Sequence, residues 1–344
     1  MSRPNPFVQL FLARLREFVR EPGVLFWVFG FPILLAVGLG IAFREKPPDV
    51  VAVGVIDAPG ADALVSALSP EAGFRTERIS AESSAERLRL GRVSIVVVPG
   101  SEYEYRFDPT RPESVLARRA VHDALERAAG RVDPVAARDE LVTAPGSRYI
   151  DFLIPGLLGM NIMSGGMWGV GYMIVEMRSR RLLKRLAATP MRRTDFLAAM
   201  VAVRMVIVFG ELALMLLFGW LVFDLAVAGS LVLVTLLSVV GALSFSALGL
   251  AVASRTAKTE IVSGLMNVVM LPMFVVSGVF FSSDRFPDAL QPLVRALPLT
   301  ALNDALRAVI LEGEPLSAQL ARIGVLLAWG LVSFLIALRM FRWN

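Results

Sequence analysis

The chain has 344 residues, of which 56% are hydrophobic and 19% are charged; its net charge is +5 and its mean hydropathy is +0.64. This composition predicts an α-helical polytopic membrane protein and argues against a soluble enzyme. The sequence holds no Cys and a single His, His122, which excludes a thiolate zinc site, an iron–sulfur centre and a disulfide framework.

The N-terminus combines an amphipathic arm, residues 1–22, with an uncharged apolar stretch, residues 23–43. In the arm, Leu12 and Leu15 share a helical face that excludes Arg16 and Arg20, which predicts a helix lying along the cytoplasmic membrane surface. A frayed extension of the first span is the alternative. The apolar stretch is long enough to cross about 30 Å of hydrocarbon and predicts the first transmembrane helix.

The segment 44–148 has a different character. Short β-branched runs such as "VVAVGVI" and "VSIVVVP" alternate with stretches of helical spacing such as "PESVLARRAVHDALERAAG". We expect a small α/β domain inserted between the first two spans, on the extracytoplasmic side.

Further apolar stretches bring the predicted number of transmembrane helices to six. Between the spans lie a cytoplasmic loop over 176–200 and an outer re-entrant or amphipathic segment over 282–320, and a cytoplasmic tail over 339–344 ends the chain. The second to sixth spans are predicted at 149–175, 203–223, 227–253, 261–281 and 321–338.

Basic residues set the predicted orientation, because cytoplasmic loops are enriched in Arg and Lys. Between Glu176 and Asp195 there is no acidic residue. The basic residues of this loop are Arg178, Arg180, Arg181, Lys184, Arg185, Arg192 and Arg193. The loop is therefore predicted to be cytoplasmic, together with both termini, in a multi-pass protein of the cytoplasmic (inner or plasma) membrane.

The sequence shows no energy source or catalytic group of its own. It lacks a G-x-x-x-x-G-K-[ST] phosphate loop, and its spans hold no His/Asp cluster for metal or acid–base chemistry. We therefore expect a chain that is not an enzyme and that is driven by a partner or by an ion gradient. Nucleic acid is not an expected partner, because in a membrane chain the surplus of basic residues indicates orientation.

The cytoplasmic loop contains a short leucine stripe surrounded by basic residues. Leu182 and Leu186 belong to this stripe, and Thr189-Pro190 ends the helix because proline disfavours the α conformation of the residue before it. Spacing alone leaves two interpretations open: a helix that docks in a groove of a partner protein, or a basic topological anchor without a partner.

Three stretches resemble the permease subunits of ABC transporters of the type-2 exporter class, in the order found in that family. They are "YIDFLIPGLLGMNIM" (149–163), "EMRSRRLLKRLAATPMRRTDFLAAM" (176–200) and "NVVMLPMFVVSGVFFSSDRFPDALQPLVRALPLTALNDALR" (267–307). The chain departs from the family where Arg180-Arg181-Leu182 replaces Gly-Thr-Leu, and where Ser282 replaces a proline after Phe-Phe.

The resemblance implies a permease dimer, homomeric or heteromeric, with two copies of a separate ABC ATPase that bind ATP and Mg²⁺. This chain would hold no cofactor and no metal. It would export a hydrophobic or amphipathic substrate, such as a lipid, a drug or an antibiotic-like molecule. Membrane lipids would surround the permease. The alternative function is that of a membrane-tethered protein whose extracytoplasmic domain binds or senses a ligand.

The resemblance also implies two sets of functional residues. The residues expected to couple to the ATPase are Glu176, Arg181, Leu182, Lys184, Arg185, Leu186, Thr189 and Pro190. Those expected to line or close the translocation path between two protomers are Asn161, Asn267, Met270, Met273, Phe274, Gly278, Phe280 and Phe281. The glycines of the second span allow close helix approach, for the path or for packing alone.

Glu211 is an acidic residue well inside a predicted span, where a charge costs about 3 kcal/mol unless it is paired or hydrated. Arg204 lies seven residues earlier on the same helical face. A structural polar contact, a role in cargo or proton handling, and exposure at the membrane surface are all compatible with this spacing.

Overall fold

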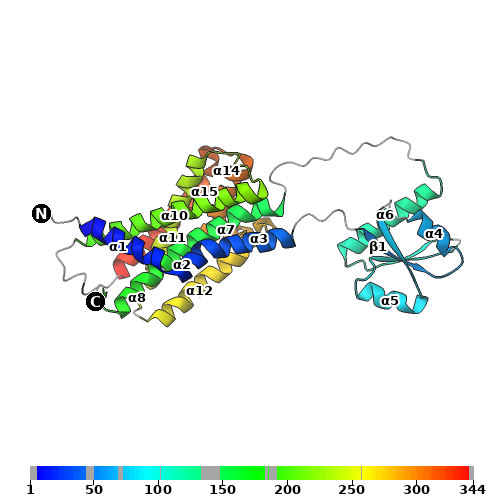
Figure 1. The fold of residues 1–344 in the computed structure, drawn as a ribbon, viewed down its shortest axis with the longest axis horizontal. Helices are drawn as coiled ribbons and strands as arrows, with labels where there is room; N and C mark the ends of the chain where they lie inside the picture. The colour runs from blue at the N-terminus through cyan, green and yellow to red at the C-terminus, as the bar shows by residue number, and fades with distance from the viewer. Residues whose placement is uncertain are drawn as a thin grey trace. The chain divides into compact units, whose positions relative to one another are not determined.

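The structure is a computed structural model that describes residues 6–43, 50–68, 73–100, 102–132, 148–182, 185, 192–256 and 258–340. The chain divides into two compact units (Figure 1). The larger unit joins Met1–Arg44 to Thr143–Asn344, and the smaller unit is Glu45–Val142.

The described part of the larger unit is helical. Its elements are α1 (Pro6–Arg20), α2 (Pro22–Leu25), the π-helix η1 (Phe26–Gly30), α3 (Phe31–Ala42), α7 (Tyr149–Gly166), the π-helix η3 (Met167–Tyr172), α8 (Met173–Ser179), α10 (Arg193–Phe223), α11 (Leu231–Ala253), α12 (Thr259–Val276), the 3₁₀ turn η4 (Ser283–Arg285), α13 (Gln291–Arg295), α14 (Pro298–Glu312) and α15 (Leu316–Met340).

Among the described residues, six helical stretches are long and apolar enough to cross a membrane, which supports the predicted polytopic membrane protein. They are Pro22–Ala42, Tyr149–Ser179, Thr194–Phe223, Leu231–Ala253, Thr259–Val276 and Leu316–Met340.

Each span differs from its predicted bounds at one end or both, and two of these differences concern the third and fifth spans. The third begins at Thr194 rather than at 203, and the fifth ends at Val276 rather than at 281. Gly278 explains the second difference, because its φ of +70° is left-handed and turns the chain out of the helix directly after Ser277.

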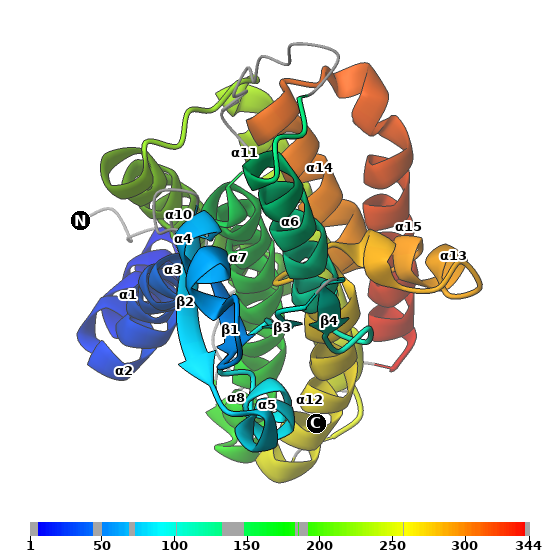
Figure 2. The same cartoon turned by 90° about the vertical axis from the view of Figure 1, so that its right-hand side faces the viewer.

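The second span, α7 with η3 and α8, lies at the centre of the bundle (Figure 2). Within its most apolar window 83% of the residues are buried, whereas the corresponding share is 28% for the third span and 17% for the sixth. Helices α3, α10, α11 and α14 all contact α7. The packing of the larger unit is therefore organised around this one span.

Glycines allow these neighbours to approach the second span closely. A Cβ atom at Gly156 would lie 2.5 Å from the carbonyl oxygen of Val279, and one at Gly171 would lie 2.5 Å from that of Gly249 on α11. A Cβ at Gly166 would lie 2.8 Å from the backbone of Phe245. Gly169 alone among the glycines of this span has open space around it. These contacts favour a packing role for most of the glycines.

Helix α14 packs against α7 through two polar side chains. Asn303 donates a hydrogen bond to the carbonyl oxygen of Ser277 at 2.9 Å, and its Oδ1 occupies the space where a side chain at Gly159 would lie. Arg307 donates to the carbonyl oxygens of Phe152, at 3.1 Å, and of Gly278. Both side chains are buried, so they fix α14 against α7 and the turn after α12.

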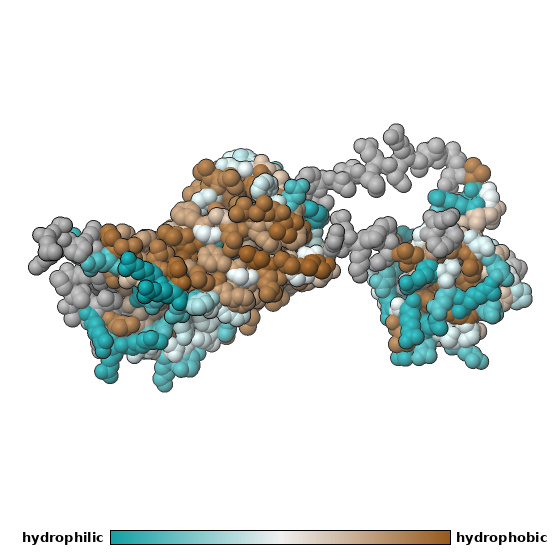
Figure 3. Space-filling view, viewed as in Figure 1, coloured by the Kyte–Doolittle hydropathy of each residue, from teal (hydrophilic) through white to brown (hydrophobic). Residues whose placement is uncertain are grey.

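The face of the larger unit that is seen in Figure 3 is mostly apolar. Hydrophilic residues gather at the end where α1 and α8 lie. Large apolar side chains are exposed on the outer helices: Leu221 on α10 is 65% exposed and Leu338 on α15 is 62% exposed. Helices that face lipid require such apolar surfaces.

The smaller unit is built on a four-stranded sheet of order β2-β1-β3-β4, in which β4 alone is antiparallel to its neighbour. Its elements are β1 (Val51–Ile56), α4 (Ala61–Ala67), β2 (Phe74–Ile79), α5 (Ala81–Arg89), β3 (Ile95–Val98), β4 (Glu104–Arg106) and α6 (Pro112–Ala128). Val53 and Val55 face a core with α4 and α6, whereas Ile56 packs on the other face with Ile79 and Leu88 of α5. Alternation along β1 thus produces helices on both faces of the sheet.

We predict that Gly159→Ala destabilises the larger unit. The added methyl group displaces Asn303 from its hydrogen bond with Ser277, and overpacking of this kind costs about 1–3 kcal/mol. Thermal unfolding in detergent measures the effect. Gly169→Ala is the matched control, because nothing lies within 4 Å of its Cβ position. Equal melting temperatures for the two variants would contradict the close contact.

Candidate functional site

The Arg-rich segment that begins at the end of α8 carries charged side chains. Glu176 pairs with Arg180 at 2.8 Å, and Arg181 and Arg185 are exposed. Arg181 has a φ of +55°, in the left-handed region that ends helices, so α8 stops before the leucine stripe begins. Lys184, Leu186, Thr189 and Pro190 lie outside the described residues.

Leu182 contacts its own protomer. It is half-buried and packs against a cluster of Ile174, Met177, Phe196 and Met200, which joins α8 to the first turns of α10. In this structure the side chain therefore attaches the loop to the helical bundle, while the neighbouring arginines face outward.

The residues expected to line a path on α12 divide between two faces of the helix. Met270 and Met273 are 3% and 5% exposed and belong to the core of the protomer, and Phe274 packs against this core. Asn267 is exposed, next to Val268, which is 70% exposed. The methionines are thus turned away from the exposed face.

That exposed face of α12 is apolar apart from the Asn267 amide. Val268, Leu271 and Val275 recur at helical spacing and are 70%, 58% and 66% exposed. We call Asn267, Val268, Leu271 and Val275 the α12 face. Sequence reasoning did not select its three aliphatic members, because α12 is apolar on all sides and offers no contrast between an inner and an outer face.

The turn after α12 carries the expected gate residues. Gly278 makes the turn, and the carbonyl oxygen of Phe280 accepts a hydrogen bond from the Tyr149 hydroxyl at 3.1 Å. Phe280 packs against the core, whereas Phe281 is 53% exposed. The two aromatic rings therefore have different surroundings, and Phe281 is the one available to a ligand or a second protomer.

Asn161, also expected on the path, is 6% exposed. Its Nδ2 donates to the carbonyl oxygen of Val28 in η1 at 2.7 Å. This hydrogen bond joins the second span to the first. Because the side chain is also buried, the Asn161 amide has little surface with which to contact a cargo.

Arg204 and Glu211 form an ion pair inside the bundle. The Arg204 Nη1 donates to Glu211 Oε1 at 2.9 Å, and its Nη2 donates to the carbonyl oxygen of Ile162, also at 2.9 Å. The guanidinium lies against Gly165, where a Cβ would clash. Less than a tenth of either residue is exposed. Arg204 Nε and Glu211 Oε2 have no hydrogen-bond partner among the described residues.

The turn that carries Phe280 and Phe281 is supported by Asn303 and Arg307. The sequence did not point to these two supporting residues. Burial lowers the pKa of Arg307 to about 10, and Asp304, 3.9 Å away, opposes this effect. The side chain remains charged at neutral pH. Asn303 and Arg307 are four residues apart on one face of α14, and this spacing is the signal that could have identified the pair.

Comparisons with known proteins agree with this helical architecture. Over 215 residues the chain is 27% identical to nodulation protein J of Rhizobium meliloti (strain 1021), covering 57% of this chain and 75% of that protein. Over 100 residues it is 31% identical to nodulation protein J of Rhizobium leguminosarum bv. viciae, covering 29% of this chain and 38% of that protein. The model of the ABC-2 family transporter proteins matches residues 123–339, which is more than half of the sequence. The chain therefore belongs to the ABC-2 family of transporter proteins, as a multi-pass permease.

Proposed function

We propose that this permease is the membrane subunit of an ATP-driven exporter, with two copies of it working beside two copies of a separate ABC ATPase. ATP and Mg²⁺ bind to the partner, and this chain holds no cofactor. The Arg-rich loop supports an orientation with both termini in the cytoplasm and the smaller unit outside.

The observation that carries this proposal is the exposed amide of Asn267 on the α12 face. A polar amide that faces hydrocarbon without a partner is costly, so this side of α12 is better explained by a second protomer or a path than by lipid. The family resemblance implies a path between two such faces.

The same face supports a hydrophobic or amphipathic cargo. Val268, Leu271 and Val275 offer aliphatic surface, and Asn267 adds one hydrogen-bonding group. A strongly hydrated solute would need more polar partners than this face provides.

For the cytoplasmic loop we propose a division of roles. Arg181 and Arg185 are exposed and available to the ATPase, whereas Leu182 transmits movement because it is packed onto α8 and α10. For the ion pair we propose a structural role, since Arg204 and Glu211 bind each other in a buried site.

Reconstitution with the ABC ATPase encoded beside this chain tests the function. We expect the two proteins to co-purify, and a hydrophobic cargo to stimulate ATP hydrolysis in liposomes. Reversing the charges of Arg181 and Arg185 to Glu should weaken co-purification at least tenfold without changing the melting temperature. Leu182→Ala should instead lower the melting temperature.

Charge reversal of Arg75 and Arg119 is the matched control, because both are exposed in the smaller unit. If the wild-type chain neither retains an ATPase nor stimulates one, the alternative of a tethered binding or sensing protein is favoured. If the charge reversals in the loop and in the smaller unit weaken co-purification of the ATPase equally, the loop has no specific role in coupling.

Phe281 is predicted to act in the outer gate. Phe281→Ala should change the export rate with little effect on stability, because the ring is more than half exposed. Phe280→Ala should cost about 1–3 kcal/mol of stability, since it removes a ring that packs against the core. Wild-type transport by Phe281→Ala would refute the gate assignment.

A structural role for the ion pair predicts a rescue. Glu211→Gln leaves a buried arginine charge uncompensated and should cost about 3 kcal/mol of stability. Arg204→Met combined with Glu211→Leu should recover most of that loss, because apolar pairs of similar volume replace buried ion pairs well. Cargo-stimulated ATP hydrolysis should recover together with the stability in this double variant. A stable double variant that no longer transports would instead assign the pair to cargo or proton handling.

A further inference from the structure

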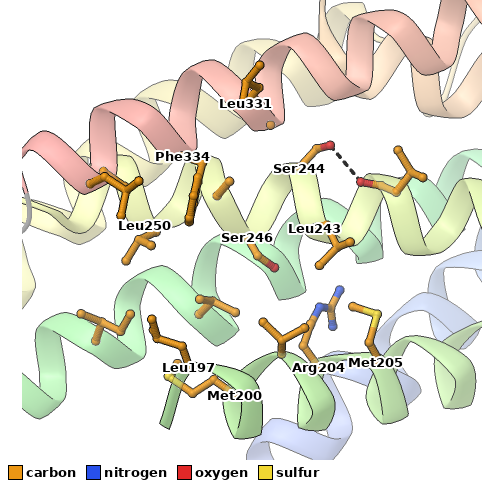
Figure 4. Close-up of a pocket in the computed structure, with 18 of the residues that line it drawn as sticks. Leu197, Met200, Arg204, Met205, Leu243, Ser244, Ser246, Leu250, Leu331 and Phe334 are labelled. Carbon is orange, nitrogen blue, oxygen red and sulfur yellow. Dashed lines mark hydrogen bonds between the residues drawn. The ribbon is translucent and has the colours of Figure 1, made fainter. Parts of the chain in front are cut away.

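A groove of about 660 Å³ lies on the side of the larger unit (Figure 4). Helix α11 contacts both α10 and α15 and forms the floor together with Val170 and Ile174 of the second span, while α10 and α15 form the walls. The walls are open to the outside, since Val201 on α10 and Leu331 on α15 are 44% and 61% exposed. Helix α12, which carries the proposed path, contributes no residue to this lining.

The lining offers almost no free hydrogen-bonding capacity. Ser244 donates to the carbonyl oxygens of Val240 and Leu326, and Ser246 donates to that of Ala242. Arg204 reaches the groove, but both of its terminal nitrogens are bound to Glu211 and Ile162. Aliphatic and aromatic side chains form the rest of the wall. Such a cavity excludes water and suits an apolar occupant.

The groove occupies one half of the membrane thickness. On α15 its lining runs from Leu327 to Leu338, about 16 Å at 1.5 Å per residue, or roughly half of a 30 Å hydrocarbon core. On α10 it runs from Leu197 to Met205, next to the N-terminus of that helix. Both walls belong to the leaflet at the Arg-rich side, which is cytoplasmic in the orientation proposed above.

Two arginines stand at the ends of the walls, at the surface of that leaflet. Arg192 is the N-cap of α10, and Arg339 lies in the last turn of α15, directly after Leu338. Both are exposed, and neither guanidinium has an ion-pair partner in the described part of the chain. Basic residues at such helix ends attract anionic lipid headgroups.

We propose that this groove binds one anionic phospholipid of the adjacent leaflet, with an acyl chain between α10 and α15 and the phosphate near Arg192 and Arg339. The length of the lining matches one leaflet, and the charges match the headgroup. The site is separate from the α12 face, so its occupant is a bound lipid and not the cargo. The inference depends on the proposed orientation only for the identity of the leaflet.

Lipid binding to the purified chain tests the groove without requiring an ATPase. Phosphatidylglycerol is titrated into delipidated protein and counted by native mass spectrometry, with one tightly bound molecule expected per protomer. Val201→Trp fills the groove and should abolish this molecule. Val222→Trp, on the same helix and 55% exposed outside the groove, should retain it. Equal binding by the two variants, or a non-lipid occupant of the wild-type groove, would overturn the proposal.

A second set of variants tests the headgroup and leaves the groove intact. Arg192→Gln and Arg339→Gln should each weaken phosphatidylglycerol binding about fivefold, and together they should remove the preference over phosphatidylcholine. Lys258→Gln, at the start of α12 on the same side, should bind like the wild type. Unchanged binding by the double variant, or equal affinity of the wild type for the two lipids, would overturn the anionic assignment. Because no arm of either experiment measures transport, failure of the exporter proposal would be seen separately.

Discussion

Close packing against the glycines of the second span determines how the larger unit is arranged. In lipid, helices gain little from burying apolar surface against one another, so tight contact and interhelical hydrogen bonds hold them together. The absence of a side chain at Gly159 admits Asn303, and Gly165 admits the Arg204 guanidinium. At Gly166 the backbone of α11 itself approaches. The polar contacts inside the bundle therefore exist because small residues leave room for them.

The same central packing leaves peripheral helices with free surfaces. Helix α12 contacts the second span mainly through η3 and α8, and only 22% of its apolar window is buried. Helices α10 and α15 are held by α11 and remain separated from each other along the groove. A rigid centre with two distinct free surfaces allows one surface to meet a second protomer while the other meets lipid.

The sequence was sufficient to predict the apolar spans and the spacing of polar residues along a helix. It was not sufficient to predict which face of an apolar helix is buried. Six apolar stretches were visible because each is a continuous signal, and the spacing of Arg204 and Glu211 placed them on one face. The side on which Met270 lies could not be predicted, because α12 lacks a polar face. Strand β2, "FRTERI", could not be predicted from the sequence, because four polar residues separate its two buried apolar ends, Phe74 and Ile79. The end of α12 depended on the left-handed turn at Gly278.

The π-helix η3 has a mechanical consequence for the second span. It lies between α7, which is packed against its neighbours, and α8, which leads to the Arg-rich loop. A π-helical turn holds more residues than an α-helical turn, so a shift of one residue in hydrogen-bond register rotates everything beyond it by about 100°. Gly169, with open space around it, lies within this segment. A one-residue shift of hydrogen-bond register within η3 would therefore re-aim α8 and the Arg-rich loop relative to α7 without breaking the helix.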